Sequence, residues 1–477
     1  MKIYRIANLA VLSFVLSIGF AAAARQTASP PAPIAPAPSP AGAPSNPEFL
    51  RAADEVLAQM SQILGLPVKQ PLKKSLRSKQ EIRAYLIREE KEDKDDAQHY
   101  ADDKALEDFG FIPKNFPFDS FMIDVLTGQI AGLYDPKAKE FYIAEWIPAH
   151  EQRDVMAHEL THALEDQNFH IEAWLKAARP NDDAELARDA VLEGSATAAM
   201  ADYVLQGLGK NVWELPEIDP ELLLGDTRTS PKFSNAPRFI RDALLFPYVA
   251  GLNFTKAALR EKRWHGLAEL FDNPPASSQQ ILHPELYRRG VKPANVTLPD
   301  AAKMLGQGWK RLDENTLGEF GVKEVLLQFL GAERAEGLAP AWVGDRYALF
   351  EHKTTKKLVL VFRLQLATPE DAARFAGQYS EAIEKKHSQR RNLFRRPNYF
   401  SFDTADGGVF LRCAEAECVT LEGGDEKLFD WMTNAMGWVP GPVRPQNLES
   451  EPAETTFLGS FPRIPVAASA ASAAFAP

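Results

Sequence analysis

Cysteine is scarce in this sequence, with two among 477 residues, Cys413 and Cys418. This scarcity excludes a scaffold held together by many disulfides. The segments 409–412 and 419–421 predict two short strands joined by a turn, and a disulfide between the cysteines would close that turn. Two reduced thiols are the alternative. A zinc site is not expected here because no histidine stands near the pair in the sequence.

An excess of positive charge is also missing. The chain has 54 lysines and arginines against 65 aspartates and glutamates, and its formal net charge is −11. Nucleic-acid binding needs a basic surface, so we expect no nucleic-acid partner. The acidity also disfavours attachment to anionic lipid, and it favours solubility.

Long apolar runs are absent after the first 24 residues. Residues 1–24 have the pattern of a signal peptide, because Lys2 and Arg5 precede an apolar stretch at 6–20 and alanines follow at 21–24. The stretch is short for a transmembrane helix, which needs about 20 apolar residues. An uncleaved membrane anchor is the alternative. We predict export to the periplasm or the cell exterior, with no stable membrane insertion after cleavage.

Composition divides the chain into five parts. The signal peptide is followed by residues 25–48, which are rich in proline and alanine and predict an extended linker. Residues 441–477 have a similar composition and predict a disordered tail. Residues 49–312 show mostly helical patterns with one short β region, and residues 313–440 mix helices and strands. We therefore predict an α+β protein with a mostly helical domain that carries a small β-sheet, followed by a smaller α+β domain.

The second domain has clear patterns but no recognisable site, so we expect a binding or scaffold role for it. Its predicted helices lie at 318–330, 369–385 and 426–436, and its predicted strands at 345–351, 357–364, 399–402, 409–412 and 419–421.

The run H-E-L-T-H at 158–162 indicates a candidate metal site. It matches the H-E-x-x-H pattern of zinc peptidases. Residues 152–167 contain no glycine or proline and predict a helix, on which positions i and i+4 share one face. His158 and His162 can then bind one metal ion, and Glu159 can reach a water molecule on that ion. An amphipathic helix with two incidental histidines is the alternative.

A hydrolytic zinc site needs a third protein ligand and one open position. The segment 184–205 predicts a helix rich in small residues, with Glu193 as the only charge between 189 and 202. Burial of a lone carboxylate is costly unless it is paired or bound to metal, so we predict Glu193 as the third ligand. A pair with Arg188, or exposure to solvent, is the alternative. Gly194 weakens the helix and predicts the close approach of another backbone.

The set of His158, Glu159, His162 and Glu193 resembles the gluzincin metallopeptidases, in which a glutamate from a second helix completes the zinc site. Residues 158–163 are similar to the active-site helix of thermolysin-like enzymes. The resemblance covers two helices and implies a zincin-like domain, one zinc ion and hydrolysis of peptide bonds.

One departure concerns the residues around the ligands. The thermolysin pattern carries an aspartate four residues after the ligand glutamate, where this chain has Thr197. The residues that hold the metal ligands in place must therefore differ. Three strings, at 131–136, 193–194 and 280–284, look closer to a group of poorly characterised bacterial secreted zincin-like proteins.

Strands predicted at 129–134 and 140–144 stand just before the metal helix and are joined by turn residues. The resemblance implies that an extended substrate adds to the edge of such a sheet through main-chain hydrogen bonds. An ordinary hairpin that covers the helix is the alternative.

Two further roles are open from the sequence. Asp166 stands two turns after His158 and either holds an imidazole from behind or is a solvated acid at the helix end. A donor for the substrate oxyanion is expected among His283, Tyr248 and Tyr287, although each is also compatible with a structural role.

Together these patterns predict a secreted or periplasmic zinc metallopeptidase. Zn²⁺ is expected to be held by His158, His162 and Glu193, with Glu159 as general base toward a metal-activated water. The expected substrate is a peptide or protein. Two alternatives are a catalytically inactive zincin-like binding or assembly protein of the cell envelope, and a metal-dependent amidase that acts on cell-wall material. Cleavage specificity and oligomeric state are not predicted.

Overall fold

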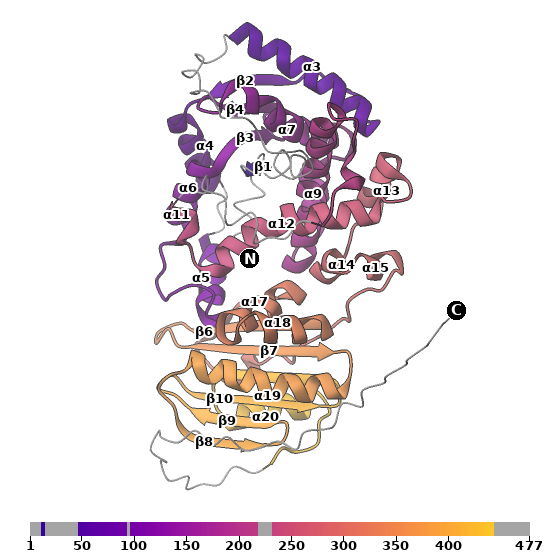
Figure 1. The fold of residues 1–477 in the computed structure, drawn as a ribbon. Coiled ribbons are helices and arrows are strands. Elements are labelled where there is room, and N and C mark those ends of the chain that lie inside the picture. The colour runs from indigo at the N-terminus through magenta and orange to yellow at the C-terminus, as the bar shows by residue number, and fades with distance from the viewer. Residues whose placement is uncertain (1–10, 15–45, 93–95, 218–230, 443–477) are drawn as a thin grey trace, which may run out of the picture.

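The computed structural model describes residues 11–14, 46–92, 96–217 and 231–442. The first part of the described chain is mostly helical, and the last part is one large antiparallel sheet with helices on both faces (Figure 1). The predicted α+β fold, with a mostly helical part followed by an α+β part, is confirmed. Most of the predicted signal peptide (1–24), linker (25–48) and tail (441–477) lies outside the described residues.

Two long helices form the centre of the helical part, α7 (Ala149–Phe169) and α9 (Asp182–Gln206). They pack against each other, α3 (Asn46–Leu64) packs on both, and α12 (Arg238–Ala258) packs along α9. The remaining helices here are α4 (Lys79–Glu92), α5 (Asp96–Phe109), α6 (Phe118–Gln129), α8 (Ile171–Lys176), η1 (Val212–Glu214), α11 (Pro231–Ser234), η2 (Arg263–Gly266), α13 (Leu267–Asp272), α14 (Ser278–Leu282) and α15 (Pro284–Arg288).

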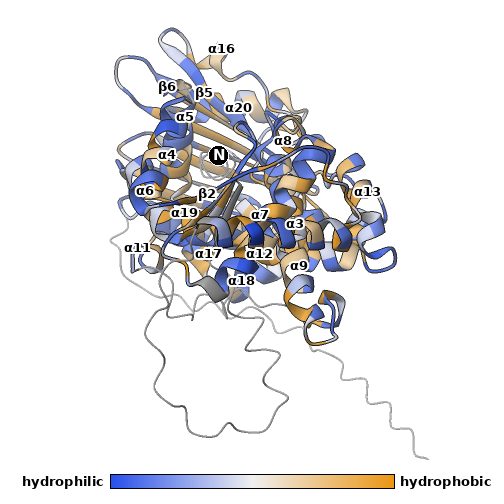
Figure 2. Cartoon of the chain, turned by 90° about the horizontal axis from the view of Figure 1, so that it is seen from above, coloured by the Kyte–Doolittle hydropathy of each residue, from blue (hydrophilic) through white to orange (hydrophobic). Residues whose placement is uncertain are grey.

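Most helices are amphipathic, and Figure 2 shows hydrophilic and hydrophobic residues together on them. In α3 the buried residues Phe49, Ala53, Val56 and Met60 recur every three or four positions, the spacing of one helix face. The central helix α9 differs, because every residue from 189 to 202 is buried. Small side chains on all sides of α9 therefore let neighbouring helices come close.

The small sheet lies beside α7 and has the strand order β1-β3-β4-β2. β3 (Ile130–Asp135) and β4 (Glu140–Ala144) form the predicted hairpin. β1 (Val11–Phe14) pairs antiparallel with β3, and β2 (Lys73–Arg77) pairs parallel with β4. The sequence did not predict β2, because a Lys-Lys-Ser-Leu-Arg strand at the outer edge of a sheet has no apolar alternation.

The large sheet has the order β5-β6-β7-β11-β10-β9-β8. Along β7, Leu360 and Phe362 belong to the main core while Val359 and Val361 belong to a second core on the other face, so both faces are buried. The predicted boundary at 313 falls within β5, the first strand of this sheet. The strands are β5 (Trp309–Asn315), β6 (Trp342–His352), β7 (Leu358–Leu366), β8 (Arg391–Arg396), β9 (Tyr399–Asp403), β10 (Gly408–Ala414) and β11 (Glu417–Gly424), and the helices are α16 (Ala302–Leu305), α17 (Gly318–Leu330), α18 (Ala332–Leu338), η3 (Ala339–Ala341), α19 (Pro369–Lys386) and α20 (Glu426–Ala435).

Cys413 and Cys418 face each other across β10 and β11 and form a disulfide. The predicted turn between two short strands, closed by a disulfide, is confirmed.

Candidate metal centre

Helix α7 presents the two histidines on one face. It begins after Pro148 and ends at His170, which adopts a left-handed backbone conformation with φ of 56°. His158 and His162 lie one turn apart, are 3% and 0% exposed, and have ring centroids 4.7 Å apart. The predicted helix is confirmed.

Helix α9 brings the third predicted ligand to them. Its first turn is capped by Asn181, whose side chain accepts a hydrogen bond from the Ala184 amide. Glu193 is 4% exposed and faces both imidazoles. The alternative pair with Arg188 does not form, since that guanidinium donates to the carbonyl of Trp174.

The three donor atoms form a compact triangle. His158 Nε2 lies 3.0 Å from His162 Nε2 and 3.1 Å from Glu193 Oε2, and His162 Nε2 lies 3.5 Å from Glu193 Oε2. Donors at about 2.0–2.1 Å from a tetrahedral zinc ion are roughly 3.3 Å apart, so the triangle has the size that one such ion requires. This buried trio can hold a metal ion, and the part of the chain that the structure describes contains no second group of this kind.

Electrostatics favour a shared cation at this triangle. Burial lowers the pKa of His158, which keeps its imidazole neutral. Burial also opposes a charge on His162, but the nearby carboxylates of Glu193 and Glu165 outweigh it and raise the pKa of His162 to about 10. The charge on His162 in turn outweighs burial and lowers the pKa of Glu193. A metal ion would take the place of the proton on His162.

Glu159, the predicted general base, is completely buried and lies against β3. A Cβ atom on Gly132 of β3 would stand 2.9 Å from Glu159 Cγ and 2.6 Å from Val155 Cγ1. Only a residue without a side chain at 132 therefore leaves room for Glu159 in this position.

Both interpretations of Asp166 are wrong, because its carboxylate is buried and does not contact an imidazole. Its carboxylate instead accepts hydrogen bonds from the Tyr134 hydroxyl at 2.6 Å and the Lys139 ammonium at 2.5 Å. The group behind His162 is Glu165, whose Oε2 lies 3.4 Å from His162 Nδ1. The sequence analysis missed Glu165, because residues 165 and 166 are both acidic and only the packing around α7 decides which one turns toward the histidine.

The three candidates for an oxyanion donor lie in different surroundings. The Tyr248 ring, from α12, lies 6.1 Å from the His158 ring, at an interplanar angle of 24°. The Tyr287 hydroxyl donates to the carbonyl of Asn273, and His283 Nε2 lies 2.8 Å from Glu319 Oε1 of α17. Tyr248 is therefore the candidate that the fold places beside the histidines.

The predicted close approach at Gly194 is confirmed. A Cβ atom there would lie 2.2 Å from the carbonyl carbon and oxygen of Gly251 on α12. The residues on either side of Gly194 face α7, so the glycine contact with α12 fixes α9 from behind.

Comparison with known families gives one match. Residues 304–428 match a family model described as a domain of unknown function, DUF8575. No curated protein and no solved structure matches the chain. The matched segment contains the large sheet and does not include the metal centre. Among the helices that the structure describes, none has both the length and the apolar character to cross a membrane.

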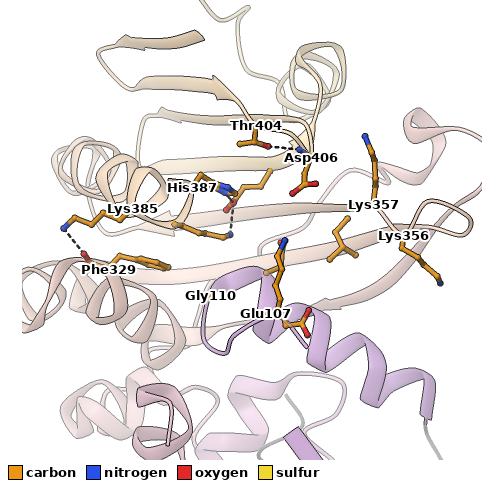
Figure 3. Close-up of a pocket in the computed structure, with 15 residues that line it drawn as sticks. Glu107, Gly110, Phe329, Lys356, Lys357, Lys385, His387, Thr404 and Asp406 are labelled. Carbon is orange, nitrogen blue, oxygen red and sulfur yellow. Dashed lines mark hydrogen bonds and ion pairs between the residues drawn. The ribbon is translucent and has the colours of Figure 1, made fainter. Parts of the chain in front are cut away.

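The matched segment, residues 304–428, contributes to a polar cavity of about 370 Å³ at its contact with α5 (Figure 3). Charged groups of both signs line it, and several are already paired. Lys386 and His387 both bind the Glu422 carboxylate, at 2.7 and 2.6 Å, and Lys385 donates to the Phe329 carbonyl. The charge of Lys386 outweighs burial and lowers the pKa of Glu422 to about 2. We assign no ligand to this cavity, since its buried carboxylate is neutralised within the protein.

Proposed function

We propose that this protein is a zinc-dependent metallopeptidase. The observation that carries the proposal is the buried triangle of donor atoms from His158, His162 and Glu193. Two imidazoles and one carboxylate are a ligand set typical of catalytic zinc.

The proposed reaction is hydrolysis of a peptide bond. A bound zinc ion supplies a Lewis acid that activates water and polarises the scissile carbonyl. Glu159 takes the proton from the attacking water and delivers it to the leaving nitrogen. Tyr248, beside His158, is the proposed donor for the negative charge that develops on the carbonyl oxygen.

An extended peptide is the proposed substrate. β3 lies beside α7 and pairs along one side with an extended segment, β1, whose residues 11–14 belong to the predicted signal peptide. Once that peptide is cleaved, a substrate can use the same main-chain hydrogen bonds of β3, so binding would need little information from side chains.

Export is part of the proposal. It rests on the signal-peptide pattern at 1–24, and the disulfide between Cys413 and Cys418 supports it because such bonds persist in oxidising compartments.

The test is the Glu159→Gln variant of the full chain. We expect it to bind one zinc ion per chain, as the wild-type protein does, while kcat on a peptide library falls by at least about 100-fold, since removal of a general base costs roughly that much. Zinc content is measured by elemental analysis and turnover by mass spectrometry of the library.

The matched control is Glu269→Gln, the same chemical change at an exposed residue on α13, which should keep full activity. Full activity of Glu159→Gln would overturn the mechanism, and a wild-type protein that binds no metal would overturn the function.

A further inference from the structure

Two buried atoms, His162 Nδ1 and Glu165 Oε2, face each other on the side of the His162 ring that points away from the other ligands. Its Nε2 points at the proposed metal position and its Nδ1 points away from it, toward Glu165 Oε2 at 3.4 Å. Both residues have 0% exposure. Neither of the two facing atoms has a hydrogen-bond partner among the residues that the structure describes. At 3.4 Å, a small shift of either side chain would bring the two atoms into a hydrogen bond.

Ser195 holds the other oxygen of this carboxylate. Its hydroxyl lies 2.5 Å from Glu165 Oε1, and it too is fully buried. Ser195 stands two residues after Glu193 on α9, while Glu165 stands three residues after His162 on α7. These contacts form a closed loop between the two helices. Glu193 of α9 contacts His162 of α7, and His162 contacts Glu165. Glu165 in turn contacts Ser195, which returns the loop to α9.

A carboxylate with no exposed surface needs a reason to be retained, because its burial is costly unless its oxygens are satisfied. Burial raises the pKa of Glu165, and the His162 and Ser195 contacts oppose that rise. A ring N–H that donates to a carboxylate keeps the other ring nitrogen free as a lone-pair donor, fixes the plane of the ring and makes it a stronger metal ligand.

We propose that Glu165 is the positioning residue of the metal centre, and that Ser195 fixes its orientation. Glu165 accepts a hydrogen bond from the Nδ1–H group of His162 and so directs Nε2 at the proposed ion. Glu165, on α7, takes the supporting role that the resembling enzymes give to an aspartate at the position of Thr197 on the second helix. The inference rests on the proposed metal site and goes beyond it by naming how that site is held.

The experiment measures metal affinity directly, by competition of Zn²⁺ with a chromophoric chelator, on the full chain. In Glu165→Met the acceptor is lost, and the Kd for Zn²⁺ should rise by about 10–100-fold, the usual effect of losing such a partner. In Glu165→Gln an amide oxygen still accepts the Nδ1 proton, so the rise should be smaller. The Co²⁺-substituted proteins give a second readout, since their visible spectrum changes when a ligand ring turns.

Asp166→Asn is the matched control. Asp166 is the next residue on the same helix and is also buried, but it bonds to Tyr134 and Lys139. Its substitution should lower the melting temperature of the metal-free protein and leave the Kd for Zn²⁺ unchanged. If Glu165→Met does not fold, Ser195→Ala keeps the test decisive, because it removes the hydroxyl that orients Glu165 and the Kd for Zn²⁺ should then rise as well.

The outcomes separate the two proposals. Wild-type protein that binds no zinc would overturn the proposed function and the role of Glu165 with it. Wild-type protein that binds zinc, with Glu165 variants that bind it equally tightly or with Asp166→Asn weakened as much, would overturn only the positioning role.

Discussion

Glu159 illustrates how a site depends on residues that take no part in its chemistry. The side chain lies in space that exists because Gly132, on the facing strand β3, has no Cβ atom. The nearest atoms are Glu159 Cγ and Val155 Cγ1, which stand close to the α7 backbone and cannot swing aside as a flexible tip could. A methyl group at 132 must therefore displace either the Glu159 side chain, the proposed base, or helix α7.

We expect Gly132→Ala to lower kcat and to leave zinc content unchanged. A displacement of the base by about 1 Å can cost roughly 100-fold in rate, while the three metal ligands do not touch residue 132. Turnover of a peptide and elemental analysis of the same preparation check this expectation.

Gly337→Ala is the control, because nothing lies within 4 Å of a Cβ atom at that position. If Gly132→Ala kept full activity, Gly132 would have no part in placing Glu159.

Some residues of the candidate site could be predicted from the sequence and others could not. His158, His162 and Glu193 were predicted, because two histidines four positions apart and a single charge among apolar residues can be recognised in the sequence. Glu165, Ser195 and the Gly132 contact were not, since the direction of a side chain around a helix acquires meaning only when its neighbours are known.

At the scale of elements, α9 is fixed on two sides. Toward α7 it contributes Glu193 and Ser195, and toward α12 it contributes Gly194, which meets Gly251 backbone to backbone. The geometry of the metal centre therefore depends on a contact that none of the ligands makes.

Gly194→Ala should lower the free energy of unfolding by about 1–3 kcal/mol, the usual cost of overpacking. Alanine by itself favours a helix over glycine by about 1 kcal/mol, so a net loss would report the collision with Gly251. Urea denaturation of the metal-free protein measures it.

Gly377→Ala on α19 is the matched control, because a Cβ atom there would have open space. It should be neutral or slightly stabilising. Equal stability of Gly194→Ala and wild type would mean that α9 and α12 can move apart without cost.

The elements that the sequence predicted have apolar residues at the regular spacing of a helix or a strand. Helices α7, α9, α17 and α19 and the hairpin of β3 and β4 were predicted almost to their ends. Strands β2 and β8, which are rich in lysine and arginine, were missed because edge strands need little apolar alternation. Helix α12 runs from Arg238 to Ala258 and continues through Pro247. Proline usually ends a helix, so the sequence pattern does not indicate the full length of α12.

At the scale of the molecule, the segment that carries the large sheet contacts the start of α9, the helix that carries Glu193. Asp183, in the first turn of α9, accepts a hydrogen bond from the Ser278 amide, and it lies against Gly318 of α17. Burial raises the pKa of Asp183 to about 7. A second contact in this region joins His283 Nε2 to Glu319 Oε1 of α17 at 2.8 Å.

The ion pair of His283 and Glu319 should make stability depend on pH. The hydrogen bond to Glu319 raises the pKa of His283 above its ordinary value of 6.5. A raised histidine pKa stabilises the fold fully below 6.5, and this contribution is lost as pH rises through the folded-state pKa. Since the His283 side chain is 29% exposed, we expect about 0.2–1 kcal/mol.

Urea denaturation of wild type and His283→Gln at pH 6 and pH 9 is the measurement. The difference between the two proteins should be present at pH 6 and shrink at pH 9, and peptide hydrolysis by the variant should persist. A difference of the same size at both pH values would show that the charge on His283 contributes nothing.

The pairing of β1 with β3 has a consequence for shortened forms of the chain. With residues 11–14 in place, β3 has a neighbour on each side. A protein that starts at the beginning of α3 would instead present the amides and carbonyls of β3 without partners along one flank, and open flanks of this kind recruit other strands. Loss of β1 would thus make β3 the edge strand of a three-stranded sheet, β3-β4-β2, and that edge could pair with another polypeptide or with the same strand of a second molecule.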